Sequence, residues 1–301
     1  MRGSDEISAI AYKLKPFRFE PPKMRRCPDK KGLVVWDFSM RPLYTWMAEG
    51  IIGNSIPRHF SMAAGPHSLD SLAVAIACGQ YKKSVTFFVP TRKLLTPVQH
   101  ALTVHSDYCD FVYHPERHIP SLSRIAQRWL IGAMARAEEP TMAYNISNAF
   151  EGHLLASAAL YRLFKEQSDA MPTRPKEIWY MTEGSILPRI ARMAWPKAMH
   201  YVIHPGKANR KDIPGKVKHL TAIPEPQFAA GKRREVELDT IAQLDGRAYD
   251  MFLRKASPRA LFINTGSDRG IRRIRKVAEI PRTQIESQVA TDLKEVNIPC
   301  N

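Results

Sequence analysis

Two short turns carry the residue types that could bind a phosphate group. The first, Ala64-Gly65-Pro66-His67-Ser68, lies between an apolar run and a helix-like segment, and the second, Thr182-Glu183-Gly184-Ser185, has the same kind of flanks. A turn of small residues at a helix N-terminus places backbone N–H groups around an anion. Either turn could also be an ordinary strand-to-helix connection. The candidate phosphate-binding or cofactor-binding residues in the two turns are Gly65, Thr182, Gly184 and Ser185.

Two further side chains could take part in catalysis. His67, in the first turn, carries an imidazole, the side chain best suited to acid–base chemistry near neutral pH. Ser39 follows the apolar run of residues 33–38 and offers a hydroxyl group. His67 could instead be a turn histidine that bonds to the backbone, and Ser39 could be a helix N-cap. We keep both as candidate catalytic residues.

The balance of charge points to a polyanionic partner. The formal net charge is +16, which a small-metabolite enzyme does not need. Clustered Lys and Arg bind nucleic acid through its phosphates and release counterions. The alternatives are a solubilising charge and, for residues 267–276, a solvated helix face. The candidate nucleic-acid-binding residues are Lys207, Arg210, Lys211, Lys216, Lys218, Lys232, Arg233, Arg234, Arg272 and Arg273.

Other features of the sequence limit its class. The four cysteines, Cys27, Cys78, Cys109 and Cys300, have no paired CxxC spacing, so we expect free thiols and no metal site. No apolar run reaches the roughly 18–20 residues of a membrane helix. The N-terminus lacks the apolar core of a signal peptide. We therefore expect a cytoplasmic protein with no membrane contact.

The turns lie in a chain where strand-like and helix-like segments alternate. The expected strands are 32–38, 58–64, 84–90, 108–115, 177–182, 199–205 and 260–266. The expected helices are 40–52, 68–81, 95–106, 119–137, 151–167, 185–195 and a part of 235–256, with a long basic loop over 206–219. This alternation predicts an α/β fold with doubly wound, mostly parallel sheets.

The expected organisation has two domains around a central cleft. Residues 1–32, rich in Pro and basic residues, read as an irregular arm that packs on the surface or on nucleic acid. The smaller domain takes residues 53–140. The larger domain is discontinuous and takes residues 33–52 and 141–301.

The order of these pieces resembles the fold-type II pyridoxal-phosphate enzymes, the group of tryptophan synthase β, cysteine synthase and aminocyclopropane-carboxylate deaminase. Residues 63–90 are similar to the Ser-Gly-Asn-His turn of that family with its helix and next strand, and residues 178–193 to its phosphate cup. "ALFINTGSDRG" resembles the late strand whose Ser or Thr faces the pyridine nitrogen. The resemblance implies that Thr265 or Ser267 takes that role, that His67 faces the cleft, and that a homodimer forms.

The sequence also departs from that family at two cofactor positions. Ser39 stands where the family has its Schiff-base lysine, and no lysine occurs between Lys31 and Lys82. Pro66 replaces the turn Asn and offers no backbone N–H. An internal aldimine therefore cannot form at the usual place. A lysine from elsewhere is a remote alternative, because Lys82 and Lys83 lie at the far end of their helix.

The resemblance and the charge together predict the function. We expect a nucleic-acid-directed enzyme of lyase or transferase type, most readily one that modifies a DNA base, as relatives do in viral (phage) pathways. Its cup would bind a substrate phosphate or an unlinked pyridoxal phosphate, so the cofactor is doubtful. The alternative is a catalytically silent relative that serves as a basic nucleic-acid-binding module.

Overall fold

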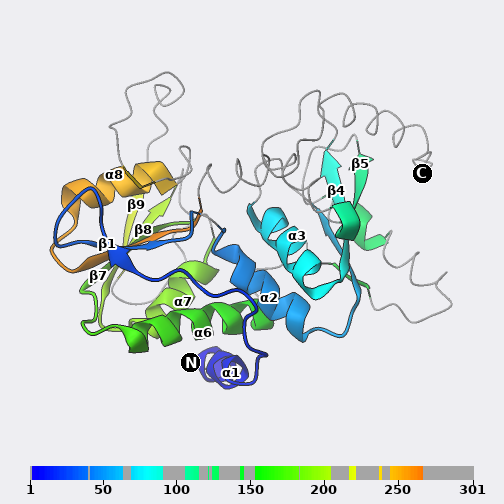
Figure 1. The fold of residues 1–301 in the computed structure, drawn as a ribbon, viewed down its shortest axis with the longest axis horizontal. Coiled ribbons are helices and arrows are strands. Elements are labelled where there is room, and N and C mark those ends of the chain that lie inside the picture. The colour runs from blue at the N-terminus through cyan, green and yellow to red at the C-terminus, as the bar shows by residue number, and fades with distance from the viewer. Residues whose placement is uncertain are drawn as a thin grey trace. The chain divides into compact units, whose positions relative to one another are not determined.

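The structure is a computed structural model, and it describes twelve parts of the chain. These are residues 2–39, 41–63, 69–90, 106–114, 121, 124–128, 143–145, 153–182, 184–204, 217–221, 237–238 and 245–266. The chain divides into two compact units (Figure 1). Unit 1 consists of residues 1–54 and 150–270, and unit 2 of residues 55–149 and 271–301.

Unit 1 is built on a six-stranded sheet, which we call sheet A. Its strands run in the order β1 (Arg25–Arg26), β2 (Val34–Asp37), β10 (Ala260–Asn264), β7 (Glu177–Met181), β8 (Met199–His204) and β9 (Val217–Thr221). Only β1 is antiparallel to its neighbour. The carboxyl ends of the other strands therefore meet at one edge of the sheet.

Helices cover both faces of sheet A, as a parallel sheet requires (Figure 1). The helix α8 (Asp245–Lys255) lies on one face. On the other lie α2 (Tyr44–Asn54), α6 (Leu154–Ala170) and α7 (Ile186–Ala194). The N-terminal helix α1 (Arg2–Ala11) packs on α6. The doubly wound α/β architecture expected from the alternating pattern is confirmed for this unit.

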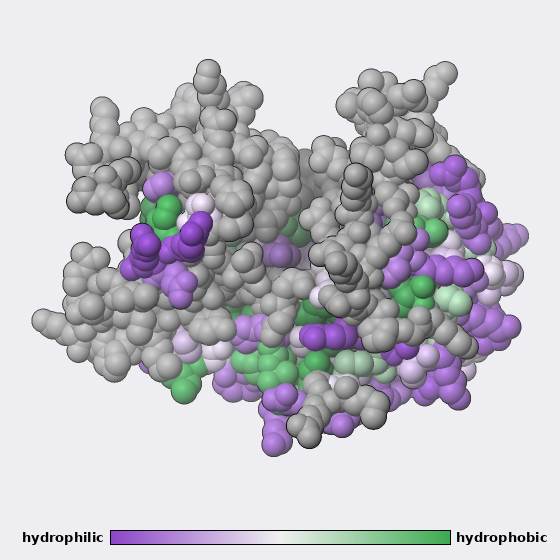
Figure 2. All heavy atoms as spheres, turned by 180° about the vertical axis from the view of Figure 1, so that it is seen from behind, coloured by the Kyte–Doolittle hydropathy of each residue, from purple (hydrophilic) through white to green (hydrophobic). Residues whose placement is uncertain are grey.

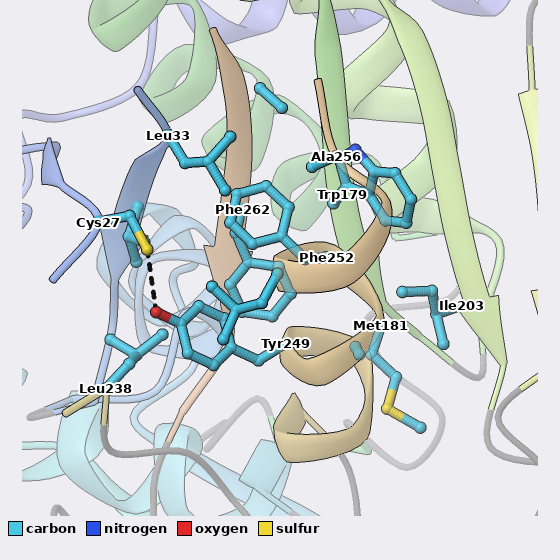
Figure 3. Packing of buried hydrophobic residues seen from close by; sticks show 14 residues of the cluster. Cys27, Leu33, Trp179, Met181, Ile203, Leu238, Tyr249, Phe252, Ala256 and Phe262 are labelled. Atoms are coloured by element: carbon cyan, nitrogen blue, oxygen red, sulfur yellow. Dashed lines mark hydrogen bonds between the residues drawn. The ribbon is translucent and has the colours of Figure 1, made fainter. Parts of the chain in front are cut away.

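The alternation of side chains along each strand explains how the two faces are filled. Trp179 and Phe262 are register partners in adjacent strands and pack toward Tyr249 and Phe252 of α8 (Figure 3). Val35, the register partner of Phe262 in β2, belongs to the same cluster. Trp36, the next residue of β2, lies on the opposite face, where its ring meets Phe164 of α6 and Trp195. Burying each large apolar side chain contributes about 1.5–3 kcal/mol. These two layers hold sheet A in place.

A chain of hydrogen bonds fastens residues 27–29 to α8. The hydroxyl of Tyr249 lies 3.0 Å from the Cys27 thiol (Figure 3) and donates to the Asp29 carboxylate at 2.7 Å. The same carboxylate accepts the backbone N–H of Glu237 at 2.8 Å and of Leu238 at 3.3 Å. Burial first, and then the hydrogen bonds of the phenol with Cys27 and Asp29, raise the pKa of Tyr249 well above its ordinary range. The phenol therefore stays protonated and acts as a fixed donor.

Unit 2 contains a four-stranded parallel sheet, sheet B. Its order is β5 (Cys109–His114), β4 (Ser84–Pro90), β3 (His59–Ala63) and β6 (Ala143–Asn145). The helix α3 (Leu69–Tyr81) packs on β4, and a single 3₁₀ turn, η1 (Ser106–Tyr108), precedes β5. Burial raises the pKa of the Cys78 thiol, and it raises that of Cys109 to about 12. Both thiols are therefore neutral and weak nucleophiles.

Several expectations need correction. Residues 1–32 are not irregular throughout, because they begin with α1, an amphipathic helix without a strong N-cap signal in the sequence. The segment 206–219 does not remain a loop, because its last residues form β9. The helix expected from residue 40 begins at Tyr44, after Pro42. The strand β6 was not expected; it pairs with β3 in unit 2, whereas the predicted domains placed residues 141–301 in the larger domain.

The segment after α1 is held against unit 1 by backbone hydrogen bonds to core side chains. The N–H of Arg18 donates to Glu49 of α2 at 3.1 Å, and the carbonyl of Phe19 accepts from the indole of Trp46 at 3.1 Å. The carbonyl of Pro22 accepts from the indole of Trp36 at 2.7 Å.

The predicted helix over 95–106 lies outside the described residues apart from Ser106. The predicted helix over 119–137 is described only at residues 121 and 124–128, where it is helical.

Candidate functional site at the carboxyl edge of sheet A

The carboxyl edge of sheet A gathers buried polar residues from several strands. Continuing the strand pairing by one or two residues places Thr265, Thr182 and His204 side by side at the ends of β10, β7 and β8. Their exposed fractions are only 4%, 6% and 5%. Ser39 follows β2 and is also buried. Ligands of open α/β sheets bind at this edge, so the sheet brings three sequence candidates, Ser39, Thr182 and Thr265, to a common location.

Asp37, the last residue of β2, fixes the segment that carries Ser39. Its Oδ1 accepts the backbone N–H of Ser39 at 3.0 Å and the Nδ2–H of Asn264 at 2.8 Å. Its Oδ2 accepts the guanidinium of Arg25 at 2.8 Å. Three donors thus orient one carboxylate, and this carboxylate sets where Ser39 lies.

The turn after β7 is closed by the Thr182 side chain. The Thr182 hydroxyl accepts the N–H of Gly184 at 3.1 Å, the local pattern that Ser and Thr use to stabilise turns. The backbone N–H of Thr182 donates to Ile203 of β8 at 3.0 Å. The helix α7 begins at Ile186, directly after Ser185, so its positive end lies at this edge. This arrangement suits a phosphate group.

Thr265 joins the end of β10 to the start of α2. Its carbonyl accepts the N–H of Leu43 at 2.9 Å, and the carbonyl of Asn264 accepts the N–H of Phe38 at 3.0 Å. The segments after β2 and β10 therefore run together at the edge. This contact places Thr265 between Ser39 and the Thr182 turn in the order of the strands.

Two histidines at the end of the sheet form a hydrogen-bonded pair that the sequence did not single out. Nε2 of His204 lies 2.9 Å from Nδ1 of His219 in β9, with the rings 16° from parallel. His204 is buried, whereas His219 is partly exposed. The signal that could have found His204 is a histidine at the carboxyl end of a predicted strand, next to the strand that carries the cup. His219 gave no such signal, because it fell in the segment expected to be a loop.

The residues around Ser39 do not fit a Schiff base at that place. Serine offers a hydroxyl and no amine, and its backbone position is fixed by Asp37. Lys82 and Lys83 follow the C-terminus of α3, about 20 Å along the helix axis from its start at Leu69. The ammonium of Lys83 donates to the carbonyl of Ser55 at 2.6 Å. The Thr182–Ser185 turn fits the phosphate of such a cofactor, but the chain does not supply its covalent anchor at residue 39.

Several candidate residues lie outside the described residues. In unit 2 these are Gly65 and His67, and in unit 1 it is Ser267. Of the candidate nucleic-acid-binding residues, only Lys218 is described. It is exposed in β9, and its ammonium lies 5.6 Å from the centre of the Tyr201 ring. The set outside is Lys207, Arg210, Lys211, Lys216, Lys232, Arg233, Arg234, Arg272 and Arg273.

Among the described residues, no three His, Cys, Asp or Glu side chains lie close enough together to hold a metal ion. None of the described helices is both long enough and apolar enough to span a bilayer.

Solved structures match nearly the whole chain. A structure of an ACC deaminase homologue matches with a TM-score of 0.64 and 11% identity, over 88% of this chain and 95% of that one. A threonine deaminase from T.th. matches with a TM-score of 0.63 and 11% identity, over 88% and 97%. Diaminopropionate ammonia lyase from Escherichia coli matches with a TM-score of 0.57 and 10% identity, over 93% and 91%.

The chain has the fold of the fold-type II pyridoxal-phosphate enzymes. The predicted resemblance and fold class are confirmed. No protein-family model matches the sequence. No curated protein matches it either. Identities of 10–11% establish the fold and leave the chemistry to be argued from the site.

Proposed function

We propose that the protein is an enzyme of lyase or transferase type that binds a phosphate-bearing ligand non-covalently at the carboxyl edge of sheet A. The observation that supports this most is the row of Thr265, Thr182 and His204, three buried polar residues at the ends of adjacent parallel strands. The turn of Thr182 and Gly184 and the start of α7 hold the phosphate. Thr265 donates or accepts a hydrogen bond in the same row.

His204 and His219 supply the acid–base group of this proposal. Only one hydrogen lies between Nε2 of His204 and Nδ1 of His219, so one ring donates and the other accepts. If His204 donates, its Nδ1 is a base; if it accepts, its Nδ1 carries a hydrogen and is an acid. When Nδ1 of His204 takes up a proton, its Nε2 proton passes to Nδ1 of His219, and His219 releases the proton of its own Nε2, so both rings stay neutral and the buried ring changes from base to acid. His219, which is partly exposed, exchanges the proton with solvent.

The substrate class in this proposal is nucleic acid, with DNA base modification as the reaction. The net charge of +16 supports it. The basic residues named from the sequence, from Lys207 to Arg273, would contact phosphates. His67 and Gly65, which lie outside the described residues, stay candidate ligand-binding residues of unit 2. Pyridoxal phosphate, if it binds, does so without a bond to residue 39, and we assign it no chemical step.

Ser39 favours a second candidate function. A chain that keeps the fold and lacks the anchoring lysine could serve as a basic nucleic-acid-binding module with no catalysis. The two candidates differ in what the carboxyl edge does. An enzyme needs a ligand there, whereas a binding module does not.

Binding of small phosphates tests the first candidate. We expect inorganic phosphate and pyridoxal phosphate to raise the melting temperature of the wild-type protein. Gly184→Asp places a carboxylate in the turn and should abolish both shifts. Gly184→Ala, which adds no charge, is the matched control. Circular dichroism checks that each variant is folded. Absence of a shift in the wild type, or full retention of it in folded Gly184→Asp, would contradict phosphate binding by this turn.

A further inference from the structure

The amino edge of sheet A, opposite the candidate site, carries a line of basic residues. Arg259 and Lys176 immediately precede β10 and β7, while Lys31 and Lys197 precede β2 and β8 by a short interval. Backbone hydrogen bonds tie these loops together: Lys176 N–H donates to Arg259, Arg259 N–H donates to Gly32, and Met199 N–H donates to Lys176. The four basic residues therefore follow the strand order β2, β10, β7, β8. We call them the amino-edge strip.

The amino-edge strip is exposed and has further basic neighbours. Its four side chains are exposed, and so are flanking basic residues of the same loops and of the end of α8: Lys30, Arg174, Arg254 and Lys255. In Figure 2 many residues at the right-hand side of the view, where the end of unit 1 lies, are hydrophilic. Within the described part of the chain, no ion pair involves any of these residues.

The carboxylates near the amino-edge strip are committed to other partners. Glu177 accepts the backbone N–H of Ser257 at 3.2 Å and the indole N–H of Trp179 at 3.0 Å. Asp29 accepts from Tyr249 and from two backbone N–H groups. One N–H of the Arg259 guanidinium donates to the carbonyl of Arg174 at 3.2 Å. A guanidinium has five N–H donors, so this bond occupies only one of them. These hydrogen bonds come from neutral donors, so both carboxylates keep their negative charge, and the eight Lys and Arg residues of the strip and its flanks outnumber them.

Arg259 also has an unfavourable backbone conformation. Its φ is +70°, in the left-handed region where glycine or asparagine is the usual residue. A charged, exposed arginine here costs about 1 kcal/mol relative to glycine. The retained strain is a reason to look for a role of the side chain.

We propose that the amino-edge strip binds the phosphate backbone of duplex DNA. Neighbouring strands lie about 4.8 Å apart, so the strip covers about 14 Å. Duplex DNA presents one phosphate per about 3.4 Å on each strand, which gives about four phosphates over that length. The proposal rests on the nucleic-acid part of the proposed function and gives it a place on unit 1. Because the strip lies opposite the carboxyl edge, it anchors the duplex and does not present a base to the site.

The test compares two triple variants of equal charge change. Lys176→Gln, Lys197→Gln and Arg259→Gln together remove three charges from the strip. The control combines Lys13→Gln, Lys15→Gln and Lys23→Gln, which are also exposed. Two of these residues lie away from the amino edge. The backbone N–H of Lys15 donates to Asn54 at the end of α2. Lys23 precedes β1, and because β1 is antiparallel to β2, this segment runs beside Asp37 at the carboxyl end of β2. Anisotropy of a labelled duplex of about 20 base pairs is measured between about 50 and 200 mM salt.

We expect the strip variant to lower the slope of log affinity against log salt by about 2–3, and the affinity by about tenfold or more at low salt. The control should keep a slope close to that of the wild type. Equal losses in the two variants would mean that net charge alone matters, and would overturn the proposal. Absence of duplex binding by the wild type would also overturn it. So would displacement of the labelled duplex by polyglutamate as readily as by unlabelled duplex.

A single substitution separates binding from stability. Arg259→Gly relieves the positive φ, so the melting temperature should rise or stay unchanged while the salt slope falls by about 1. An unchanged slope in this variant would contradict the role of Arg259. The strip variant should keep the rise in melting temperature with inorganic phosphate, because the turn of Thr182 and Gly184 lies at the opposite edge of sheet A. Loss of phosphate binding at the turn and loss of the strip are therefore distinguishable outcomes.

Discussion

His204 and His219 share one hydrogen bond, with Nε2 of the first ring 2.9 Å from Nδ1 of the second. The bond joins the last residue of β8 to the outer strand of sheet A. Because one nitrogen must donate and the other accept, the tautomer of His204 is set by that of His219. The buried ring at the carboxyl edge is therefore coupled to a partly exposed ring, and this makes it the strongest acid–base candidate that the described residues contain.

Removal of His219 should release the tautomer of His204. In the wild type at a pH of about 8, nitrogen NMR of the imidazoles should show one dominant tautomer for each ring, with a single hydrogen between Nε2 and Nδ1. In His219→Ala, His204 should become a mixture of tautomers. The internal control is His200, whose Nε2–H donates to the carbonyl of Trp195 at 3.0 Å and should not change. A wild-type pair in which the facing nitrogens, Nε2 of His204 and Nδ1 of His219, both carry a hydrogen or both lack one would refute the coupling.

Protonation of His200 should destabilise the fold in mild acid. Burial, which outweighs the hydrogen bond to Trp195, lowers the pKa of His200 to about 4 from the ordinary 6.5. The unfolded chain binds this proton below about pH 6.5 and the folded chain only near 4, so stability is present above 6.5 and decreases as the pH falls through that window. The loss amounts to about 3 kcal/mol.

The measurement is the free energy of urea unfolding between about pH 7 and 4. His200→Gln keeps a donor for the Trp195 carbonyl and has no group that titrates in this window. Its pH dependence should be flatter than that of the wild type by about one proton. Parallel curves for the two proteins would show that another group is responsible.

Gly50 lies where α2 and α6 pack closely, and an alanine there should destabilise unit 1. An added Cβ would overlap with Cβ of Ala159 and would lie 2.8 Å from the carbonyl oxygen of Leu155. The helices must shift to accept it, which costs about 1–3 kcal/mol or more. Chemical unfolding of Gly50→Ala measures this loss. Ala159→Gly in the same chain removes one clash and should recover a part of it; no recovery would argue against this contact as the cause.

The sequence predicted the elements whose pattern is strong. The apolar runs of β2, β7 and β10 alternate with amphipathic helices, and that alternation was sufficient for the α/β architecture. Ser39, Thr182 and Thr265 each lie at or just after the end of a predicted strand, and parallel strands bring their carboxyl ends to one edge. These patterns are local, so they can be recognised in a single sequence.

The missed features depend on pairing between distant segments. β9 begins within a basic stretch, and only its pairing with β8 makes it a strand. The His204–His219 bond exists only once that pairing forms. The amino-edge strip consists of three lysines and one arginine from four loops that are far apart in the chain. No continuous run of basic residues in the sequence therefore indicates it. Asp37 and Asn264 meet for the same reason.

The central claim, a phosphate site without a Schiff base at residue 39, is tested most directly by borohydride reduction. The wild-type protein and Ser39→Lys are each incubated with pyridoxal phosphate, reduced, and weighed as intact chains, after circular dichroism has verified their fold. The account predicts no covalent adduct on the wild type and an adduct mapped to residue 39 in the variant. A stoichiometric adduct on the wild type, mapped to one lysine, would contradict it and name the residue that replaces the usual anchor.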